Sequence, residues 1–126
     1  MRAEDVTILI GDNSVLARKQ LKDAIVSFGI SRILDAADGQ EAVELYKEHV
    51  PDIVFLSLLM PEKDGATTIS EIMEINPNAD IIVVSSMGTQ SQIKQTFQLG
   101  AKEFIQKPFH SQQITDILRS RLEGSV

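Results

Sequence analysis

Short apolar segments recur along the chain and are separated by polar stretches that contain glycine or proline. The clearest one, Ile53 to Leu56, is apolar at every position and follows Pro51-Asp52 directly. A run of that length without polar alternation is typical of a strand buried on both faces of a parallel sheet. On this pattern the sequence predicts five strands, at residues 7–10, 32–37, 53–56, 81–84 and 103–106.

Helical periodicity follows each of these segments. Apolar residues there recur mostly three and four positions apart, which places them on one face of a helix. The five sets are Leu21, Ile25 and Phe28; Ala42, Val43 and Tyr46; Ile69, Ile72 and Met73; Ile93, Phe97 and Leu99; and Ile114, Ile117, Leu118 and Leu122. The fourth helix, expected over Thr89 to Leu99, has the narrowest apolar stripe, so we expect it to be mobile.

Capping residues mark the helix ends. Asn13 or Ser14 is a suitable N-cap for the first helix, and Gly29 is a suitable stop. Asp38 followed by Glu41 has the spacing of a capping box before the second helix. Because strands and helices alternate with short connections, the sequence predicts an α/β protein with a doubly wound parallel sheet and helices on both faces. We expect residues 1–126 to form a single domain.

The composition narrows the class of protein. The net charge is −6 without an offsetting basic stripe, which argues against non-specific nucleic-acid binding. There is no cysteine, which excludes disulfides and thiol chemistry, and no apolar run approaches the ~18 residues of a membrane span. We therefore expect a cytoplasmic protein without nucleic-acid or membrane partners.

Polar residues gather where the predicted strands end, at the edge where open α/β sheets place their ligands. They are Asp12 and Asn13 after the first strand, Ser57 after the third, Ser85 and Ser86 after the fourth, and Lys107 after the fifth. Helix capping accounts for Asn13, but it does not account for a lysine that precedes a proline. Together these residues predict a functional site at the carboxyl edge of the sheet.

The order and spacing of six motifs are highly specific. They are Asp12-Asn13-Ser14, Pro51-Asp52-Ile53-Val54, Met60-Pro61 with Asp64-Gly65, Ser85-Ser86-Met87-Gly88, Gly100-Ala101-Lys102 and Lys107-Pro108-Phe109. In these motifs the chain, from Ile8 to Leu122, resembles the receiver domains of bacterial two-component response regulators, and most of all the single-domain CheY-like type. The resemblance implies five strands in the order 2-1-3-4-5 with five flanking helices.

The resemblance also implies a chemistry. A histidine kinase would phosphorylate an aspartate at position 57, and Mg²⁺ would be held by an acidic pair at 12 and 13, that aspartate and the Leu59 carbonyl. The hydroxyl of Ser85, with Ser86 beside it, and the amine of Lys107 would contact the phosphoryl group. Pro108 would follow a cis peptide bond.

An output face is implied as well. Phe104 matches an aromatic position whose rotamer reports activation, and Gln95 and Gln106 are candidate contacts beside it. The implied partners are a histidine kinase or phosphotransfer protein and a downstream target protein. The implied state is a monomer or weak dimer that is not an enzyme.

Three departures fall on or near this chemistry: Ser57 stands at the acceptor position, Asn13 replaces the second acid, and Gly11 replaces an aliphatic residue. A serine hydroxyl needs an adjacent base before it attacks, so we expect phosphorylation to be abolished or impaired. With one carboxylate in place of three, Mg²⁺ binding should be weak or absent. Asp12 is left as the counter-charge near Lys107, and Gly11 should remove packing at the strand end.

Three alternatives stay open. The chain could be an ordinary CheY-like phosphorylation switch that carries an engineered Ser57, although one substitution does not explain Asn13 and Gly11. A flavodoxin-like cofactor binder is disfavoured by the acid in the 11–14 loop and by an aromatic content of 5 %. A hydrolase with Ser57 as nucleophile lacks the glycines that flank such a serine.

Overall fold

A single parallel sheet forms the centre of the molecule. The computed structural model describes residues 2–86 and 88–123. Its strands are β1 (Thr7–Gly11), β2 (Arg32–Ala36), β3 (Ile53–Leu56), β4 (Ile81–Ser85) and β5 (Glu103–Gln106). They pair in the order β2-β1-β3-β4-β5, with every neighbouring pair parallel. All five predicted strands are confirmed, and so is their order.

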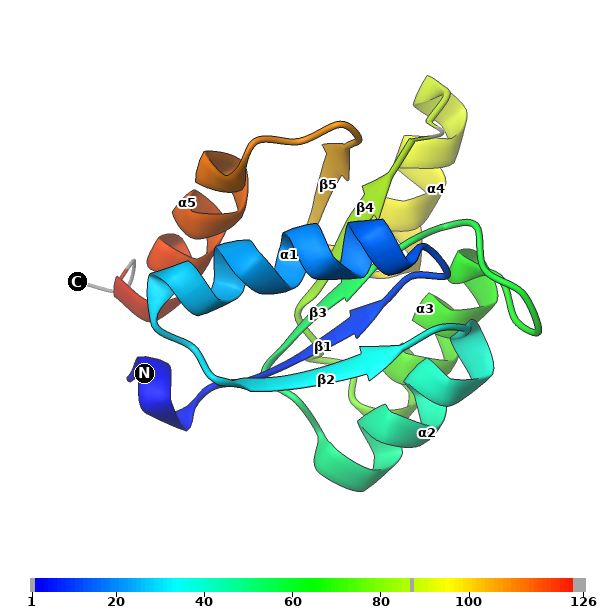
Figure 1. Cartoon of the computed structure of the whole chain (residues 1–126). Helices are drawn as coiled ribbons and strands as arrows, with labels where there is room; N and C mark the ends of the chain where they lie inside the picture. The colour runs from blue at the N-terminus through cyan, green and yellow to red at the C-terminus, as the bar shows by residue number, and fades with distance from the viewer. Residues whose placement is uncertain (1, 87, 124–126) are drawn as a thin grey trace.

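Helices cover both faces of this sheet (Figure 1). They are α1 (Val15–Phe28), α2 (Gly39–His49), α3 (Gly65–Ile75), α4 (Gln90–Leu99) and α5 (Ser111–Glu123), and a short 3-10 helix, η1 (Ala3–Asp5), precedes β1. Helices α1 and α5 lie side by side on one face, and α2 and α3 lie on the other. Within the described residues, no helix is long and apolar enough to cross a membrane.

Two apolar clusters flank the sheet because successive strand side chains point to opposite faces. In β3, Ile53 and Phe55 pack toward α1 and α5, whereas Val54 and Leu56 pack toward α2 and α3. All four side chains are buried. This double burial explains why the strands appear in the sequence as continuous apolar runs.

Ser14 is the N-cap of α1: its hydroxyl oxygen accepts a hydrogen bond from the Ala17 amide at 3.1 Å. Asn13, the other candidate, is exposed and does not cap the helix. Gly29 ends the helix in a left-handed conformation (φ 112°), as predicted. Ser14 therefore both caps α1 with its hydroxyl and donates its amide to the Asp12 carboxylate.

The capping box predicted for α2 is only half formed. Asp38 accepts a hydrogen bond from the Glu41 amide at 2.8 Å, but the Glu41 carboxylate accepts from the Ala37 amide instead of the Asp38 amide. A complete capping box occurs at α4, where Thr89 and Gln92 bond reciprocally. The prediction for Asp38 and Glu41 was wrong in this detail: the chain before the cap brings the Ala37 amide, and not the Asp38 amide, to the Glu41 carboxylate.

Helix α4 contacts the rest of the fold through a narrow stripe, as its sequence predicts. Thr96 is its buried residue within the described part of the chain, and Phe97 is largely exposed. Ile93 and Leu99 are half-buried. The mobility of α4 stays a prediction.

Candidate functional site at the carboxyl edge of the sheet

The parallel topology brings the predicted polar residues to one edge of the sheet. Asp12 follows β1, Ser57 follows β3, Ser85 ends β4 and Lys107 follows β5. Main-chain hydrogen bonds tie these ends together: Ser57 N–H donates to the Gly11 carbonyl and Lys107 N–H donates to the Ser85 carbonyl, each at 2.9 Å. The convergence expected from strand order is therefore present.

Asp12 is the charged centre of this edge, and only 1 % of it is exposed. The Lys107 ammonium donates to Oδ2 at 2.6 Å, and the Ser14 amide donates to Oδ1 at 2.9 Å. The Arg18 guanidinium donates to the main-chain carbonyl of Asp12. A buried carboxylate needs a paired cation, and Lys107 supplies it, as the loss of an acid at position 57 led us to expect.

Ser57 lies buried beside Asp12 at the end of β3, with 4 % of its surface exposed. Its hydroxyl donates to the Leu59 carbonyl at 3.4 Å, a long contact. Within the described part of the chain, this hydroxyl makes no hydrogen bond to a carboxylate or an imidazole. The serine therefore has no base positioned to take its proton.

Gly11 does not leave the end of β1 unpacked. A β-carbon built there would lie 2.8 Å from Leu56 Cδ1, with Ala42 and Met60 next nearest. The Leu56 methyl group fills the space that an aliphatic side chain at position 11 would occupy. The expected loss of packing was wrong for this reason.

The side chains at this edge do not fit a magnesium ion held by an acidic cluster. Both Asp12 oxygens accept hydrogen bonds from the chain itself, and Asn13 is exposed and uncharged. Across residues 2–86 and 88–123, no group of three or more His, Cys, Asp or Glu side chains is arranged to hold a metal. Mg²⁺ prefers carboxylate oxygens in a near-octahedral set, and of Asp12, Asn13, Ser57 and Leu59 only Asp12 supplies a carboxylate, which is already paired with Lys107.

The loop after β3 is held by close backbone packing at Gly65. The Gly65 amide donates to the Leu58 carbonyl at 2.9 Å, and a β-carbon at Gly65 would lie 2.6 Å from the Ser57 carbonyl oxygen. Asp64 caps α3, and the Thr67 amide that donates to its carboxylate lowers the pKa of Asp64 below 3.8. The contacts of Gly65 hold the backbone of Ser57 and Leu58 close to the start of α3.

The two serines at the end of β4 have different environments. Ser85 is buried at the strand end. Ser86 is exposed and, with Ser14, Leu16 and Lys107, lines a cavity of about 280 Å³. Met87, part of the same motif, lies outside the described residues.

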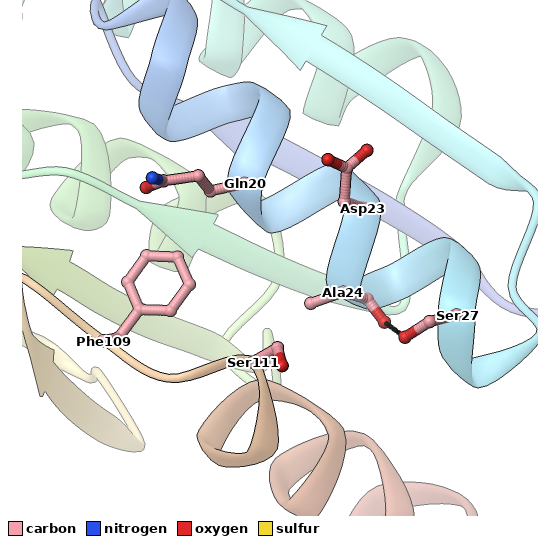
Figure 2. Close-up of a pocket in the computed structure, with 6 residues that line it drawn as sticks. All are labelled: Gln20, Asp23, Ala24, Ser27, Phe109 and Ser111. Carbon is pink, nitrogen blue, oxygen red and sulfur yellow. Dashed lines mark hydrogen bonds between the residues drawn. The ribbon is translucent and has the colours of Figure 1, made fainter.

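A second cavity, of about 360 Å³, continues along α1 (Figure 2). Gln20 and Phe109 line both cavities. Figure 2 shows Gln20, Ala24 and Ser27 of α1 on one side of the opening, with Phe109 and Ser111 on the other. The sequence did not indicate this groove: Gln20, Asp23, Ala24 and Ser27 recur at helical spacing, but only Ala24 among them is apolar, so they form no apolar stripe.

The predicted output residues occupy two elements. Phe104 is half-buried against the cluster under α2 and α3, and Gln106 is exposed two residues further along β5. Gln95 is exposed on α4 and lines a cavity of about 190 Å³ with Leu58 and Leu59. The Lys107-Pro108 peptide bond is cis, as the resemblance implied.

Comparisons with known proteins agree on the class of protein. The family model for the response regulator receiver domain matches residues 8–119. The chemotaxis protein CheY of Bacillus subtilis is 42 % identical over 115 residues, covering 91 % of this chain and 96 % of that protein. CheY of Thermotoga maritima is 45 % identical over 111 residues, covering 88 % and 92 %. The chain belongs to the response regulator receiver domain family.

Within that family the likeness is to CheY. A chain in the crystal structure of the CheX–CheY–BeF3–Mg²⁺ complex from Borrelia burgdorferi superimposes with a TM-score of 0.89 at 40 % identity, covering 94 % of this chain and 90 % of that one. The protein is thus a CheY-like receiver domain of two-component signalling, a family of signalling proteins.

Proposed function

We propose that this receiver domain signals by binding partner proteins and that its phosphorylation is abolished or impaired. The observation that carries the proposal is the environment of Ser57: a buried hydroxyl that bonds the Leu59 carbonyl, and no carboxylate or imidazole of the described residues, at the position where the family places its acceptor aspartate. A carboxylate attacks phosphorus in its ionised form, whereas this hydroxyl first has to lose a proton.

Weak or absent Mg²⁺ binding belongs to the same proposal. The Asp12 carboxylate already accepts hydrogen bonds from Lys107 and Ser14. To a metal ion, Asn13 would offer no negative charge and Leu59 only a main-chain carbonyl. Without a firmly held divalent cation, charge that develops on a transferring phosphoryl group is not neutralised. Ser85, Ser86 and Lys107 are the proposed equivalents of the phosphoryl contacts.

The proposed partners are a histidine kinase or phosphotransfer protein on the input side and a target protein on the output side. The complex from Borrelia burgdorferi pairs CheY with CheX, which supports a protein partner of that kind here. The proposed docking face carries Gln95, Phe104 and Gln106. We propose that the domain acts as a monomer or weak dimer.

Intact-mass analysis after incubation with acetyl phosphate and Mg²⁺ tests the loss of phosphorylation. The wild-type chain should keep its mass, and the double variant Asn13→Asp/Ser57→Asp, which restores both carboxylates, should gain a phosphoryl group. Ser57→Asn, which has the size of the aspartate without an attacking carboxylate, is the matched control and should also keep its mass. A phosphoryl group on the wild-type chain would contradict the proposal.

The same experiment separates the proposal from its closest alternative, a switch with an engineered serine. If Ser57→Asp is phosphorylated as readily as the double variant Asn13→Asp/Ser57→Asp, Ser57 alone silences the site. If only the double variant is phosphorylated, Asn13 also contributes. The second result favours a receiver that is atypical at more than one position.

A further inference from the structure

The contact between Lys107 and Asp12 joins two loops that are 95 residues apart in the sequence. The Asp12 side chain is 2 % exposed, and the Lys107 side chain is 22 % exposed. The second carboxylate oxygen of Asp12 accepts the Ser14 amide. Both oxygens are thus engaged by groups of the chain itself, one of them by a full positive charge.

The surroundings of this pair are cationic. Lys107 pairs with the Asp12 carboxylate, and the Arg18 guanidinium donates to the main-chain carbonyl of the same residue, so two basic side chains bind Asp12. A divalent cation that approached Asp12 would have to displace the Lys107 ammonium and would be repelled by Arg18. The position that would attract a metal in an acidic cluster is occupied by the chain's own charge.

Lys107 is also anchored through its main chain. Its amide donates to the Ser85 carbonyl at 2.9 Å, and it follows Gln106 at the end of β5 directly. The ammonium contact to Asp12 therefore ties the end of β5 to the end of β1, while the amide ties it to β4. Phe104 and Gln106 lie on the strand that is held in this way.

We propose that Lys107 is a built-in counter-ion that replaces a divalent metal in this chain, so that the arrangement of the site and of β5 does not depend on Mg²⁺. This inference rests on the proposed function, in which phosphotransfer is lost. Lys107 is a positioning residue here, because it acts through Asp12. The consequence is that removing its charge should create a response to Mg²⁺ that the wild-type chain lacks.

Thermal unfolding in EDTA and in millimolar MgCl₂ tests this. The wild-type Tm should be the same in both. Lys107→Met keeps the length of the side chain and removes its charge; its Tm in EDTA should fall by roughly 10 °C, because Asp12 is left buried and unpaired. Millimolar Mg²⁺ should then raise that Tm by about 2 °C or more, since Asp12 is free to bind a cation.

Two matched variants separate the charge from the side chain. Lys107→Arg keeps a cation, so its Tm should be the same in EDTA and in MgCl₂. Lys102→Met removes an exposed lysine just before β5 and should change neither the Tm nor its response. In wild type and Lys102→Met, the amide resonances of Ser14 and Gln106 should not shift on addition of Mg²⁺; in Lys107→Met they should.

The double variant Asp12→Asn/Lys107→Met completes the test. It removes the unpaired charge, so it should recover most of the lost Tm and lose the Mg²⁺ response. If Lys107→Met fails to fold, folding of the double variant supports the proposal and its failure contradicts it. A wild-type Tm that rises with Mg²⁺ as much as that of Lys107→Met, or a Lys107→Met Tm equal to wild type, would overturn it. Phosphorylation of Ser57 would overturn the proposed function and leave these Tm readouts unaffected.

Discussion

The first residue of α2, Gly39, packs directly against the carbonyl oxygen of Lys63 in the loop after β3. A β-carbon at position 39 would lie well under 3.0 Å from that oxygen, closer than real β-carbons approach other atoms, and Thr68 Oγ1 would be the next nearest atom. The Lys63 ammonium in turn forms an ion pair with Glu71 of α3. The absence of a side chain at Gly39 therefore lets α2 pack closely against the loop after β3, which contains Leu59 and Lys63.

Gly39→Ala should lower the free energy of unfolding by about 3 kcal/mol, because backbone atoms have to move to admit a methyl group. In an unconstrained helix the same change stabilises, by roughly 0.5–1 kcal/mol, so the sign itself is diagnostic. Urea unfolding monitored by circular dichroism measures the difference. The neighbouring exposed residue gives the control: Gln40→Ala should stay within about 0.5 kcal/mol of wild type.

Val50 ends α2 in the left-handed conformation, with φ 43° and ψ 63°. A β-branched side chain is strained there, and 54 % of Val50 is exposed, so little packing offsets the strain. Val50→Gly should raise the free energy of unfolding by about 0.5–1 kcal/mol, the relief of strain being partly offset by the freedom that glycine gains in the unfolded chain. Val50→Ala keeps the β-carbon and should gain less; an equal gain for both would show that strain is not the cause.

The strands, the site residues and Gly39 differ in how far the sequence could predict them. Strands and helices were predictable because burial on one or two faces leaves periodic apolar patterns, as at Ile53–Leu56. Asp12, Ser57, Ser85 and Lys107 were predictable as neighbours because parallel strands place their carboxyl ends at one edge. The contact of Gly39 with Lys63 leaves no such pattern, since it depends on how two loops pack in space.

The capping box predicted at α2 was wrong because sequence spacing alone does not decide which local hydrogen bond forms. The spacing of Asp38 and Glu41 is that of a capping box, yet the Glu41 carboxylate bonds the Ala37 amide. Thr89 and Gln92 have the equivalent spacing and do form the box. Spacing identifies which groups can reach one another, and the path of the chain before the cap decides which amide is taken.

Asp64 gives the site loop a dependence on pH. Its carboxylate caps α3 by accepting the Thr67 amide at 2.8 Å, which lowers the pKa of Asp64 below 3.8 in the folded chain. The stabilisation is therefore present above pH 3.8 and is lost as the pH falls through the lower folded value. Because the side chain is largely exposed, the effect should be a few tenths of a kcal/mol.

Asp64→Asn keeps an oxygen that can cap the helix and removes the titrating group. The difference in the free energy of unfolding between wild type and Asp64→Asn should shrink as the pH is lowered from neutral to about 3. Urea unfolding across that range measures it. A difference that stays constant with pH would mean that the charge of Asp64 does not contribute.

Arg121 binds two carboxylates at the amino ends of β4 and β5, on the side of the sheet away from the candidate site. Its guanidinium bonds both carboxylate oxygens of Asp80, at 2.7 and 3.2 Å, and lies 2.9 Å from Glu103. The hydrogen bond to Asp80 raises the pKa of Arg121 above its ordinary value. The side chain thus joins α5 to the residue before β4 and to the first residue of β5.

Arg121→Met keeps much of the apolar stem and removes the charge, leaving two partly buried carboxylates side by side without a cation. It should lower the free energy of unfolding by about 1–3 kcal/mol, measured by urea unfolding. Lys19→Met is the control, because the ion pair of Lys19 with Asp23 is exposed on α1 and should contribute no more than about 0.5 kcal/mol. If both variants lose the same small amount, the bidentate geometry at Arg121 adds nothing beyond a surface ion pair; a loss confined to Arg121→Met shows that burial of the carboxylates is what makes this cation necessary.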